Sequence, residues 1–418
     1  MFPKALSTIH PLAWTIIIGT MFGRVVTSMS IPFLAIYLTS TMGVSATQTG
    51  FIVAASSLAG VSISFYGGYI SDRIGRKKVM LVSVFCWAIV FFGFAASTVV
   101  WMFFIVNILN GLCRSVFEPA SRALLSDTTP PEHKLLVFNL RYAAINIGVV
   151  FGPILGLRLG SAESTFPFFI AGIVYVLYGV VLILQFAAHS EGLPAPSAAT
   201  PPKIREAFAV TSRDRIFLPI LIGTTFCVLG YGHFSSTLAQ YVSLAPEIDN
   251  GKQLFSYMLA MNAAVVLLVQ YPVVKFASTF RPVVPLILGN IFVALSLLMF
   301  GMGHSLFLLL SSVFVFTVGE VLTFTMIDVL IDRIAKPEWK GTYFGTIGFN
   351  NLGNVMAPVI GGLLIDRFAS HSGFAIFAPL ALLTAVGLPF LWAAHRRLTV
   401  KEAIESKSEG SEPKIGVV

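Results

Sequence analysis

The feature that most constrains this chain is a series of twelve long apolar stretches separated by short polar segments. A helix that crosses a bilayer needs roughly 20 apolar residues, and each stretch reaches that length. Soluble domains carry about 25% charged residues, whereas 11% of these 418 residues are charged and 56% are hydrophobic. The sequence therefore predicts an all-α membrane protein whose spans cover approximately 12–38, 46–70, 79–97, 100–126, 135–160, 165–188, 215–243, 253–277, 282–303, 305–331, 341–366 and 373–394.

The same residues exclude several other classes of protein. Runs that are continuously apolar, rather than alternating, exclude a β-barrel. The net charge of +8 does not indicate nucleic-acid binding, because the basic residues alternate with the spans. The three cysteines lie inside apolar runs, so we predict no disulfide, metal site or cofactor. Without an esterase elbow, a zinc-protease motif or a nucleotide-binding loop, a membrane enzyme or sensor is the weaker alternative, and any pumping must use an ion gradient.

The distribution of Lys and Arg predicts the orientation. With the N-terminus inside, the inner segments hold 20 basic residues and the outer segments hold three, namely Arg158, Lys252 and Arg367. Cytoplasmic loops carry the excess of Lys and Arg in membrane proteins, so both termini are predicted to be cytoplasmic. Short loops without a targeting segment favour the inner (plasma) membrane of a bacterial cell, and we expect the protein to be a monomer.

The chain divides into two similar halves. A Pro-rich segment at 189–214 is predicted to be a cytoplasmic linker between bundles at 1–188 and 215–395, and residues 396–418 are predicted to be an unstructured polar tail. An internal repeat supports this division, because Pro131-Glu-His-Lys134 and Pro337-Glu-Trp-Lys340 each precede a Gly- and Pro-containing apolar run at an offset of about 205 residues. Two such halves are typical of secondary transporters.

The strongest motif lies between the second and third spans and reads Gly68-Tyr-Ile-Ser-Asp72-Arg73-Ile-Gly75-Arg76-Lys77-Lys78. A basic loop alone would explain the four cations but not Asp72 or the two glycines. The segment resembles the loop motif of the major facilitator superfamily, Gly-x-x-x-Asp-Arg/Lys-x-Gly-Arg-Arg/Lys-Arg/Lys. This resemblance, which extends over roughly residues 12–395, implies two pseudo-symmetric six-helix bundles that work by alternating access.

Each part of this motif has a physical reading. Gly68 allows close approach of a neighbouring helix, and Gly75 allows a tight turn. Asp72 is expected to pair with an Arg or to lie at a helix N-terminus, where backbone N–H groups favour an anion. We therefore predict a conformational latch on the cytoplasmic side that consists of Gly68, Asp72, Arg73, Gly75 and Arg76.

A second motif lies in the fifth span and reads Gly148-x-x-x-Gly152-Pro153-x-x-Gly156. It resembles the core of the antiporter motif of drug-exporting members, although Leu157 replaces the last Gly. Small-residue packing against another helix is the alternative, and a similar run in the second half, from Gly353 to Gly362, weakens the case for export. The Arg-x-x-x-Gly of many exporters is also absent, because its Arg position holds Asn107; Arg114, on the same helix face, is a candidate replacement.

Narrower cues resemble the bacterial proton-coupled drug and small-peptide exporters. These are Gly23-Arg24 followed by Pro32, then Phe117-Glu118-Pro119, and Val318-Gly319-Glu320. A charge near the bilayer centre costs about 3 kcal/mol on insertion scales, so charged residues inside spans are expected to face an aqueous cavity. Members of the superfamily build that cavity from helices 1, 4, 7 and 10. The predicted substrate cavity contains Arg24, Asn107, Arg114, Glu118, His233, Glu320 and Asp328.

Four residues are candidate proton carriers. Glu320 comes first, because no cation lies within one turn of it and burial disfavours a charged carboxyl group; Glu118, Asp127 and His233 follow. The alternatives remain open: Arg114 and Glu118 form a structural pair along one helix face with Arg122, His233 is a core residue, and Asp127 joins Asp332 and Arg141 in pairs or gates near the cytoplasmic surface.

The resulting functional prediction is proton-coupled efflux of drug-like or amphiphilic small molecules. The alternative is an importer or symporter of peptides or organic anions, because Arg24 and Arg114 could bind a carboxylate. The sequence leaves open the substrate, the direction of transport, the stoichiometry, the carboxyl group that carries the proton, the organism and the oligomeric state.

The predicted topology can be tested by labelling. A single cysteine introduced at Ser197, in a variant without Cys86, Cys113 and Cys227, should resist an impermeant maleimide added to intact cells, because the linker is predicted to lie inside. Rapid labelling of Ser197→Cys from outside would overturn the orientation.

Overall fold

The computed structural model describes residues 9–44, 46–159, 164–189, 203–244, 251–303, 305–368 and 373–409. Within these residues the chain is helical, and twelve segments are long and apolar enough to cross a membrane, which confirms the all-α prediction. Their bounds are Pro11–Ile31, Phe51–Ile74, Arg76–Ala96, Val100–Asp127, Pro131–Gly156, Phe166–Ala188, Phe217–Val242, Tyr257–Ala277, Val283–Met302, Leu306–Ile334, Pro337–Ile365 and Gly373–Ile404.

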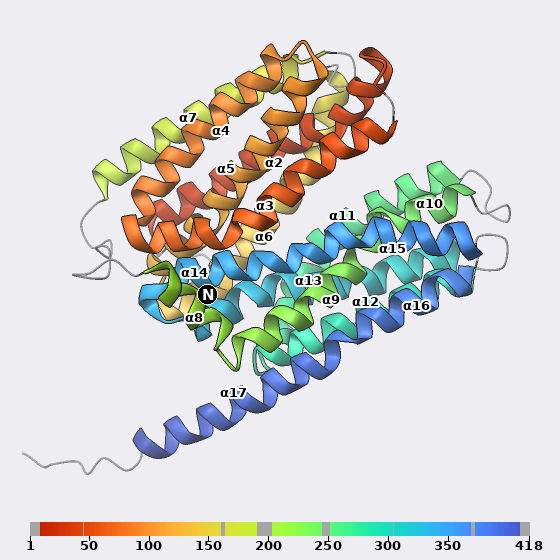
Figure 1. Ribbon diagram of the computed structural model, residues 1–418. Helices are drawn as coiled ribbons and strands as arrows, with labels where there is room; N and C mark the ends of the chain where they lie inside the picture. Colours follow the sequence, from red (N-terminus) through yellow and green to blue (C-terminus); the bar gives the residue numbers. More distant parts are fainter. Residues whose placement is uncertain are drawn as a thin grey trace, which may run out of the picture.

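The first six spans form one bundle, drawn in red to yellow in Figure 1. Long apolar runs make these helices, and each run ends where polar or turn-forming residues begin. The bundle consists of α2 (Pro11–Ile36) with the short π-helix η1 (Tyr37–Thr41), α3 (Ala46–Ile74), α4 (Arg76–Ala96), α5 (Val100–Asp127), the 3₁₀ turn η2 (Pro131–His133), α6 (Lys134–Arg158) and α7 (Phe166–Ala188).

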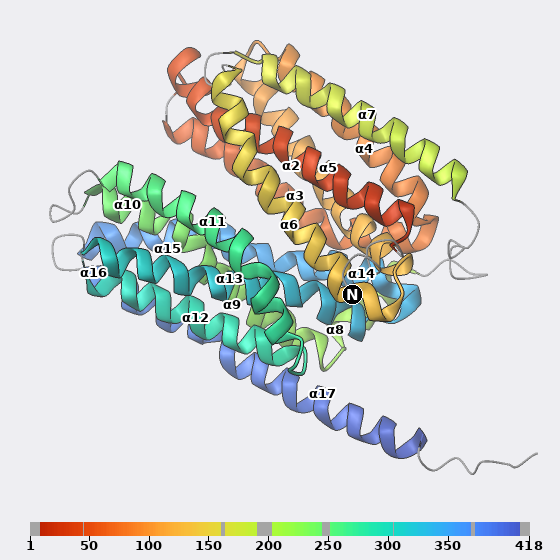
Figure 2. The same cartoon turned by 180° about the vertical axis from the view of Figure 1, so that it is seen from behind.

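The last six spans form a second bundle, drawn in green to blue. Figure 2 shows from behind that the two bundles lie side by side and meet near α14. The helices are α9 (Phe217–Ser235), α10 (Thr237–Leu244), α11 (Gly251–Ala277), α12 (Val283–Met302), α13 (Leu306–Ile334), η3 (Pro337–Trp339), α14 (Lys340–Thr346), η4 (Ile347–Asn351), α15 (Leu352–Phe368), α16 (Gly373–Ala385) and α17 (Gly387–Glu409).

Two sequence predictions about the polar segments are wrong in part. The tail was expected to be unstructured from Arg396, but α17 continues as a helix to Glu409 and projects from the bundle (Figure 1). Glu402 on this helix forms ion pairs with Arg333 at 2.9 Å and Arg281 at 4.0 Å, which hold the extension near the bundle. The linker also contains a helix, α8 (Ile204–Ser212), whereas its residues 190–202 lie outside the described part of the chain.

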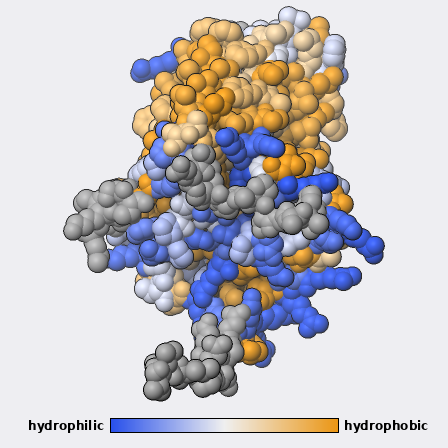
Figure 3. Space-filling view, turned by 90° about the vertical axis from the view of Figure 1, so that its left-hand side faces the viewer, coloured by the Kyte–Doolittle hydropathy of each residue, from blue (hydrophilic) through white to orange (hydrophobic). Residues whose placement is uncertain are grey.

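The surface separates into an apolar flank and a polar end. Figure 3 looks onto the end that bears α8 and α14, where hydrophilic side chains gather, while the flank of the N-terminal bundle is hydrophobic. Large apolar side chains on the flanks are strongly exposed, for example Phe307 at 83% and Leu268 at 76%. Such surfaces are stable in contact with lipid rather than water.

The Gly-x-x-x-Gly-Pro run packs α6 against α2. A Cβ atom on Gly148 would lie 2.9 Å from both the carbonyl oxygen of Met21 and the backbone nitrogen of Val25. The corresponding Gly353 of the second half approaches α9 in the same way, 2.5 Å from the backbone nitrogen of Leu229. Close helix packing, which both copies share, therefore accounts for these glycines.

This packing predicts a stability difference between two glycine variants. Gly148→Ala should lower the free energy of unfolding by about 1–3 kcal/mol, because backbone atoms of α2 cannot move away from the added methyl group. Gly362→Ala is the matched control, because nothing lies within 4 Å of its added Cβ atom. Thermal unfolding of the purified variants in detergent measures both. Equal stability of the two would contradict this account of the α2–α6 contact.

Candidate functional site

Asp72 joins the two halves at the N-terminus of α14. Its carboxylate accepts hydrogen bonds from the backbone nitrogen atoms of Gly341, at 2.9 Å, and Thr342, at 2.6 Å, and from the Thr342 hydroxyl, at 2.6 Å. It also forms an ion pair with Arg76. Both contacts expected for Asp72 are therefore present: an Arg partner and a helix N-terminus, where the helix dipole favours an anion.

Only part of the motif between the second and third spans is a loop. The side chain of Asp72 is fully buried, and α3 continues to Ile74. Gly75, with a φ of 95°, is the single residue between α3 and α4. Only glycine adopts this backbone conformation at little cost, which confirms its predicted role in the turn. Arg73 points elsewhere, is exposed, and donates a hydrogen bond to the Tyr69 hydroxyl at 3.2 Å.

Glycines on both sides make the contact between α3 and α14 possible. A Cβ atom on Gly68 would lie 2.6 Å from the carbonyl carbon of Gly341 and 3.0 Å from the Cα atom of Gly345. The Ser64 hydroxyl donates to the Gly345 carbonyl oxygen at 2.6 Å. The predicted close approach at Gly68 is confirmed, and its partner helix belongs to the other half of the chain.

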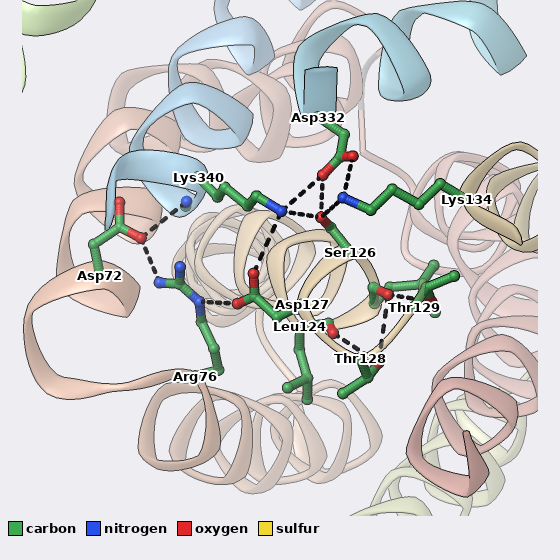
Figure 4. Close-up of polar contacts among 12 residues, drawn as sticks. Asp72, Arg76, Leu124, Ser126, Asp127, Thr128, Thr129, Lys134, Asp332 and Lys340 are labelled. Carbon is green, nitrogen blue, oxygen red and sulfur yellow. Dashed lines mark hydrogen bonds and ion pairs between the residues drawn. The ribbon is translucent and has the colours of Figure 1, made fainter. Parts of the chain in front are cut away.

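Two lysines at equivalent positions of the repeat connect the halves (Figure 4). Lys134, at the start of α6, forms an ion pair with Asp332 of α13 at 2.5 Å. Lys340, at the start of α14, forms ion pairs with Asp332 at 3.1 Å and with Asp127 of α5 at 3.6 Å. Arg76 also lies 3.3 Å from Asp127. The structure thus places Asp127, a predicted proton carrier, between two cations at the interface.

A second group of charges lies deeper in the bundle. Glu118 of α5 binds Arg24 of α2 at 2.6 Å and also pairs with Arg141 of α6. Arg141 reaches Asp328 of α13 at 3.5 Å, and Arg122 of α5 reaches it at 3.0 Å. We refer to these five residues as the central ion network. Because it includes Asp328, it also crosses from one half to the other.

The expected pairing along α5 is wrong. Glu118 takes its partners from α2 and α6 rather than Arg114 or Arg122 of its own helix, and Arg122 takes its carboxylate from α13. Arg122 also donates a hydrogen bond to the Phe344 carbonyl oxygen at 3.1 Å. Arg141 was expected in pairs or gates, but its partners Glu118 and Asp328 were not predicted, because spacing along one helix does not show which neighbouring helix faces it.

Glu320 has a different environment. It is buried in α13 at 4% exposure, and it accepts hydrogen bonds from the Asn262 amide at 2.8 Å, the Tyr142 hydroxyl at 3.1 Å and the Tyr231 hydroxyl at 3.4 Å. Among the described residues, no Lys, Arg or His nitrogen lies within 4 Å of it. Tyr142 belongs to α6, so this contact also joins the halves. Tyr142 and Asn262 were missed, although polar side chains inside apolar spans were a usable signal.

Among the described residues, His233 forms neither a hydrogen bond nor an ion pair with Glu320. It is fully buried, its Nδ1 atom is hydrogen-bonded to the Thr237 hydroxyl at 2.8 Å, and its Nε2 atom has no partner among the described residues. This environment fits the alternative interpretation of His233 as a core residue.

A cavity of about 260 Å³ lies inside the N-terminal bundle. Four of the predicted cavity residues line it, namely Arg24, Asn107, Arg114 and Glu118, together with Trp87, Tyr175, Tyr178 and hydroxyl-bearing residues of α2 and α3. His233, Glu320 and Asp328 lie outside its lining. Asn107 is also structural, because its amide donates to the Ile52 carbonyl oxygen at 2.7 Å and thereby links α5 to α3.

Comparisons with known proteins agree with this architecture. Residues 16–351 match the family model of the Major Facilitator Superfamily. The chain is 54% identical to the uncharacterized MFS-type transporter YqjV of Bacillus subtilis, over 95% of this chain and 97% of that protein. It is 25% identical to the multidrug resistance protein MdtH of Photorhabdus laumondii, over 90% and 91% of the two chains. The fucose:proton symporter FucP of Escherichia coli superposes with a TM-score of 0.73 at 14% identity, over 91% and 98% of the chains.

The chain therefore belongs to the Major Facilitator Superfamily. It is a multi-pass secondary transporter with bacterial relatives, and its fold is the one the loop motif implied. Membership of a transporter family confirms that it is not an enzyme.

The contacts of Asp72 predict an effect on closure between the halves. Charge-assisted hydrogen bonds contribute about 1.5–3 kcal/mol, so Asp72→Asn should raise the labelling rate of a cysteine placed at Ser64, in the variant without native cysteines, roughly tenfold or more. Glu132→Gln is the control, because Glu132 is exposed on η2. Maleimide labelling of purified protein measures the rate. If Asp72→Asn labels no faster than Glu132→Gln, Asp72 does not hold the halves together.

Proposed function

We propose that this transporter exports amphiphilic small molecules in exchange for protons, in the plasma membrane of a bacterial cell with both termini in the cytoplasm. The observation that carries the proposal is the environment of Glu320. A carboxyl group inside a membrane span is costly, so such a residue is usually paired with a cation or has a function. Glu320 is surrounded by neutral donors rather than cations. Its hydrogen bond to Tyr142 crosses the interface between the two halves.

The cross-interface contacts support a state that is closed to the cytoplasm. The cross-half hydrogen bonds and ion pairs described above involve α3 at Ser64 and Asp72, α5 from Arg122 to Asp127, and α6 from Lys134 to Tyr142. These segments adjoin the α3–α4 turn and the α5–α6 connection, which carry the basic residues assigned to the cytoplasmic side. In that orientation, the cavity of the N-terminal bundle lies between these cross-half contacts and the outer side of the membrane.

Protonation of Glu320 would change how firmly the halves are held. A carboxylate accepts hydrogen bonds from Tyr142, Tyr231 and Asn262 together. A protonated carboxyl group is a weaker acceptor, and its own O–H group needs an acceptor. A proton that arrives from outside therefore weakens the Tyr142–Glu320 bond and favours opening to the cytoplasm. Release of that proton, followed by substrate binding, favours the return to the state that is closed to the cytoplasm. This order links one proton to one change of access.

The cavity and the relatives support an amphiphilic substrate. The lining combines aromatic rings, including Trp87, Tyr175 and Phe117, with charged and hydroxyl groups, which suits a molecule with an apolar body and a polar end. One relative is named a multidrug resistance protein. The second candidate, uptake of organic anions together with protons, is favoured by the exposed Arg114 in the same cavity. The direction of flux under an imposed pH gradient separates the two.

The proposed coupling predicts the behaviour of Glu320→Gln in proteoliposomes. The glutamine resembles the neutral form permanently, so the variant should exchange substrate down its concentration gradient but should lose tenfold or more of proton-driven accumulation. The transported probe is chosen by screening amphiphilic antibiotics for thermal stabilisation of the wild-type protein.

The comparison variant is Glu118→Gln, which removes the other predicted carrier from the central ion network. If Glu320→Gln keeps proton-driven transport and Glu118→Gln loses it, the proton site lies on α5. If both keep it, neither carboxyl group carries the coupling proton.

A further inference from the structure

Arg114 is the exception among the charged residues inside the N-terminal bundle. It lies about halfway along α5, it is exposed, and it lines the 260 Å³ cavity. Its three neighbours of like chemistry, Arg24, Arg122 and Arg141, all have carboxylate partners. Among the described residues Arg114 has no ion pair and no hydrogen bond. A guanidinium group inside a membrane span normally has a partner, because the unpaired charge is costly there.

The surroundings of Arg114 carry an excess of positive charge. Arg24 lines the same cavity and Arg122 lies eight residues further along α5, and both are like charges that repel Arg114. Glu118, one turn further along α5, uses one carboxylate oxygen for Arg24 and the other for Arg141, and it forms no ion pair with Arg114 among the described residues. The central ion network contains three guanidinium groups and two carboxylates, so it is positively charged even before Arg114 is added. An anion in the cavity would relieve this repulsion.

A second, independent feature marks the same cavity as a polar binding site. Tyr178 lines the cavity and is 8% exposed, and its hydroxyl oxygen is buried beneath the lining without a hydrogen-bond partner among the described residues. A buried hydroxyl group without a partner costs free energy, and a carboxylate oxygen is a suitable acceptor for it. The remaining lining supplies aromatic surface from Trp87, Phe117 and Tyr175, against which an apolar body can pack.

We propose that this cavity binds the carboxylate group of the transported molecule, with Arg114 as its ion-pair partner and Tyr178 as a hydrogen-bond donor. The inference rests on the proposed transport function and names its substrate class, amphiphilic organic acids. The site lies wholly within the N-terminal half, whereas Glu320 lies in the C-terminal half. Anion and proton therefore bind to different halves, and neither has to displace the other from a shared residue.

Calorimetric titration of the purified full-length protein in detergent tests this site without any proton gradient. Three probes share one apolar body and differ in the polar group: 4-tert-butylbenzoate, 4-tert-butylbenzyl alcohol and 4-tert-butylbenzylammonium. The wild-type protein should bind the benzoate at least tenfold more tightly than the alcohol, and the ammonium most weakly. Benzoate affinity no higher than that of the alcohol would overturn the proposal.

Matched variants assign the preference to particular groups. Arg114→Gln should lower benzoate affinity about tenfold or more and leave alcohol affinity within about twofold, while Arg114→Lys should recover part of the loss. Tyr178→Phe should lower benzoate affinity several-fold. Arg158→Gln, which removes an exposed Arg at the end of α6, should change neither. If Arg114→Gln keeps the full benzoate preference, the anion site lies elsewhere.

This result is separate from the test of proton coupling. An intact benzoate preference with unchanged proton-driven transport in Glu320→Gln would refute the coupling site but keep the anion site. Loss of proton-driven transport in Glu320→Gln, together with no benzoate preference, would keep the coupling site but refute the anion site.

Discussion

The structure depends on the need of each charged group inside the apolar bundles to find a partner. Moving an ion out of water is expensive, and Coulomb attraction recovers that cost only at short range and with good geometry. Here the partners lie on other helices, and in several cases in the other half of the chain: Arg122 with Asp328, Lys134 with Asp332, and Asp72 with the N-terminus of α14. The same contacts that neutralise the charges also hold the two halves together, so separation of the halves requires new partners or water for all of them.

The internal repeat makes this closure reciprocal. Lys134 of the first half binds Asp332 of the second, and Lys340 of the second half binds Asp127 of the first. The close contact of Gly68 with Gly341 brings the backbones near enough for Asp72 to reach the N–H groups of α14. Because packed interfaces of this kind have discrete arrangements rather than a continuum, the closure is suited to switching between two states.

Arg114 and Glu320 do not follow this pairing rule. The interval between them, 206 residues, is the interval that separates Lys134 from Lys340, so they occupy equivalent positions in the fourth and the tenth spans. One is a cation exposed to a cavity, and the other is a carboxyl group among neutral donors. Groups left without an opposite charge are those whose energy responds most to a proton or to a charged ligand. For this reason the proposed roles in transport fall on these two residues.

The sequence by itself determined the twelve spans, the two-half repeat and the residues of the Asp72 motif, because apolar length, glycine positions and charge in an apolar run act locally along the chain. It also identified Glu320 and Arg114 as charges that need an explanation. It did not determine their partners. The pairing of Glu118 with Arg114 along α5 was wrong, and the helical course of 396–409 was missed. Only the tertiary structure decided these partners. The partner of a buried charge depends on how helices distant in sequence pack and on which faces they present to each other, whereas helical spacing describes one helix at a time.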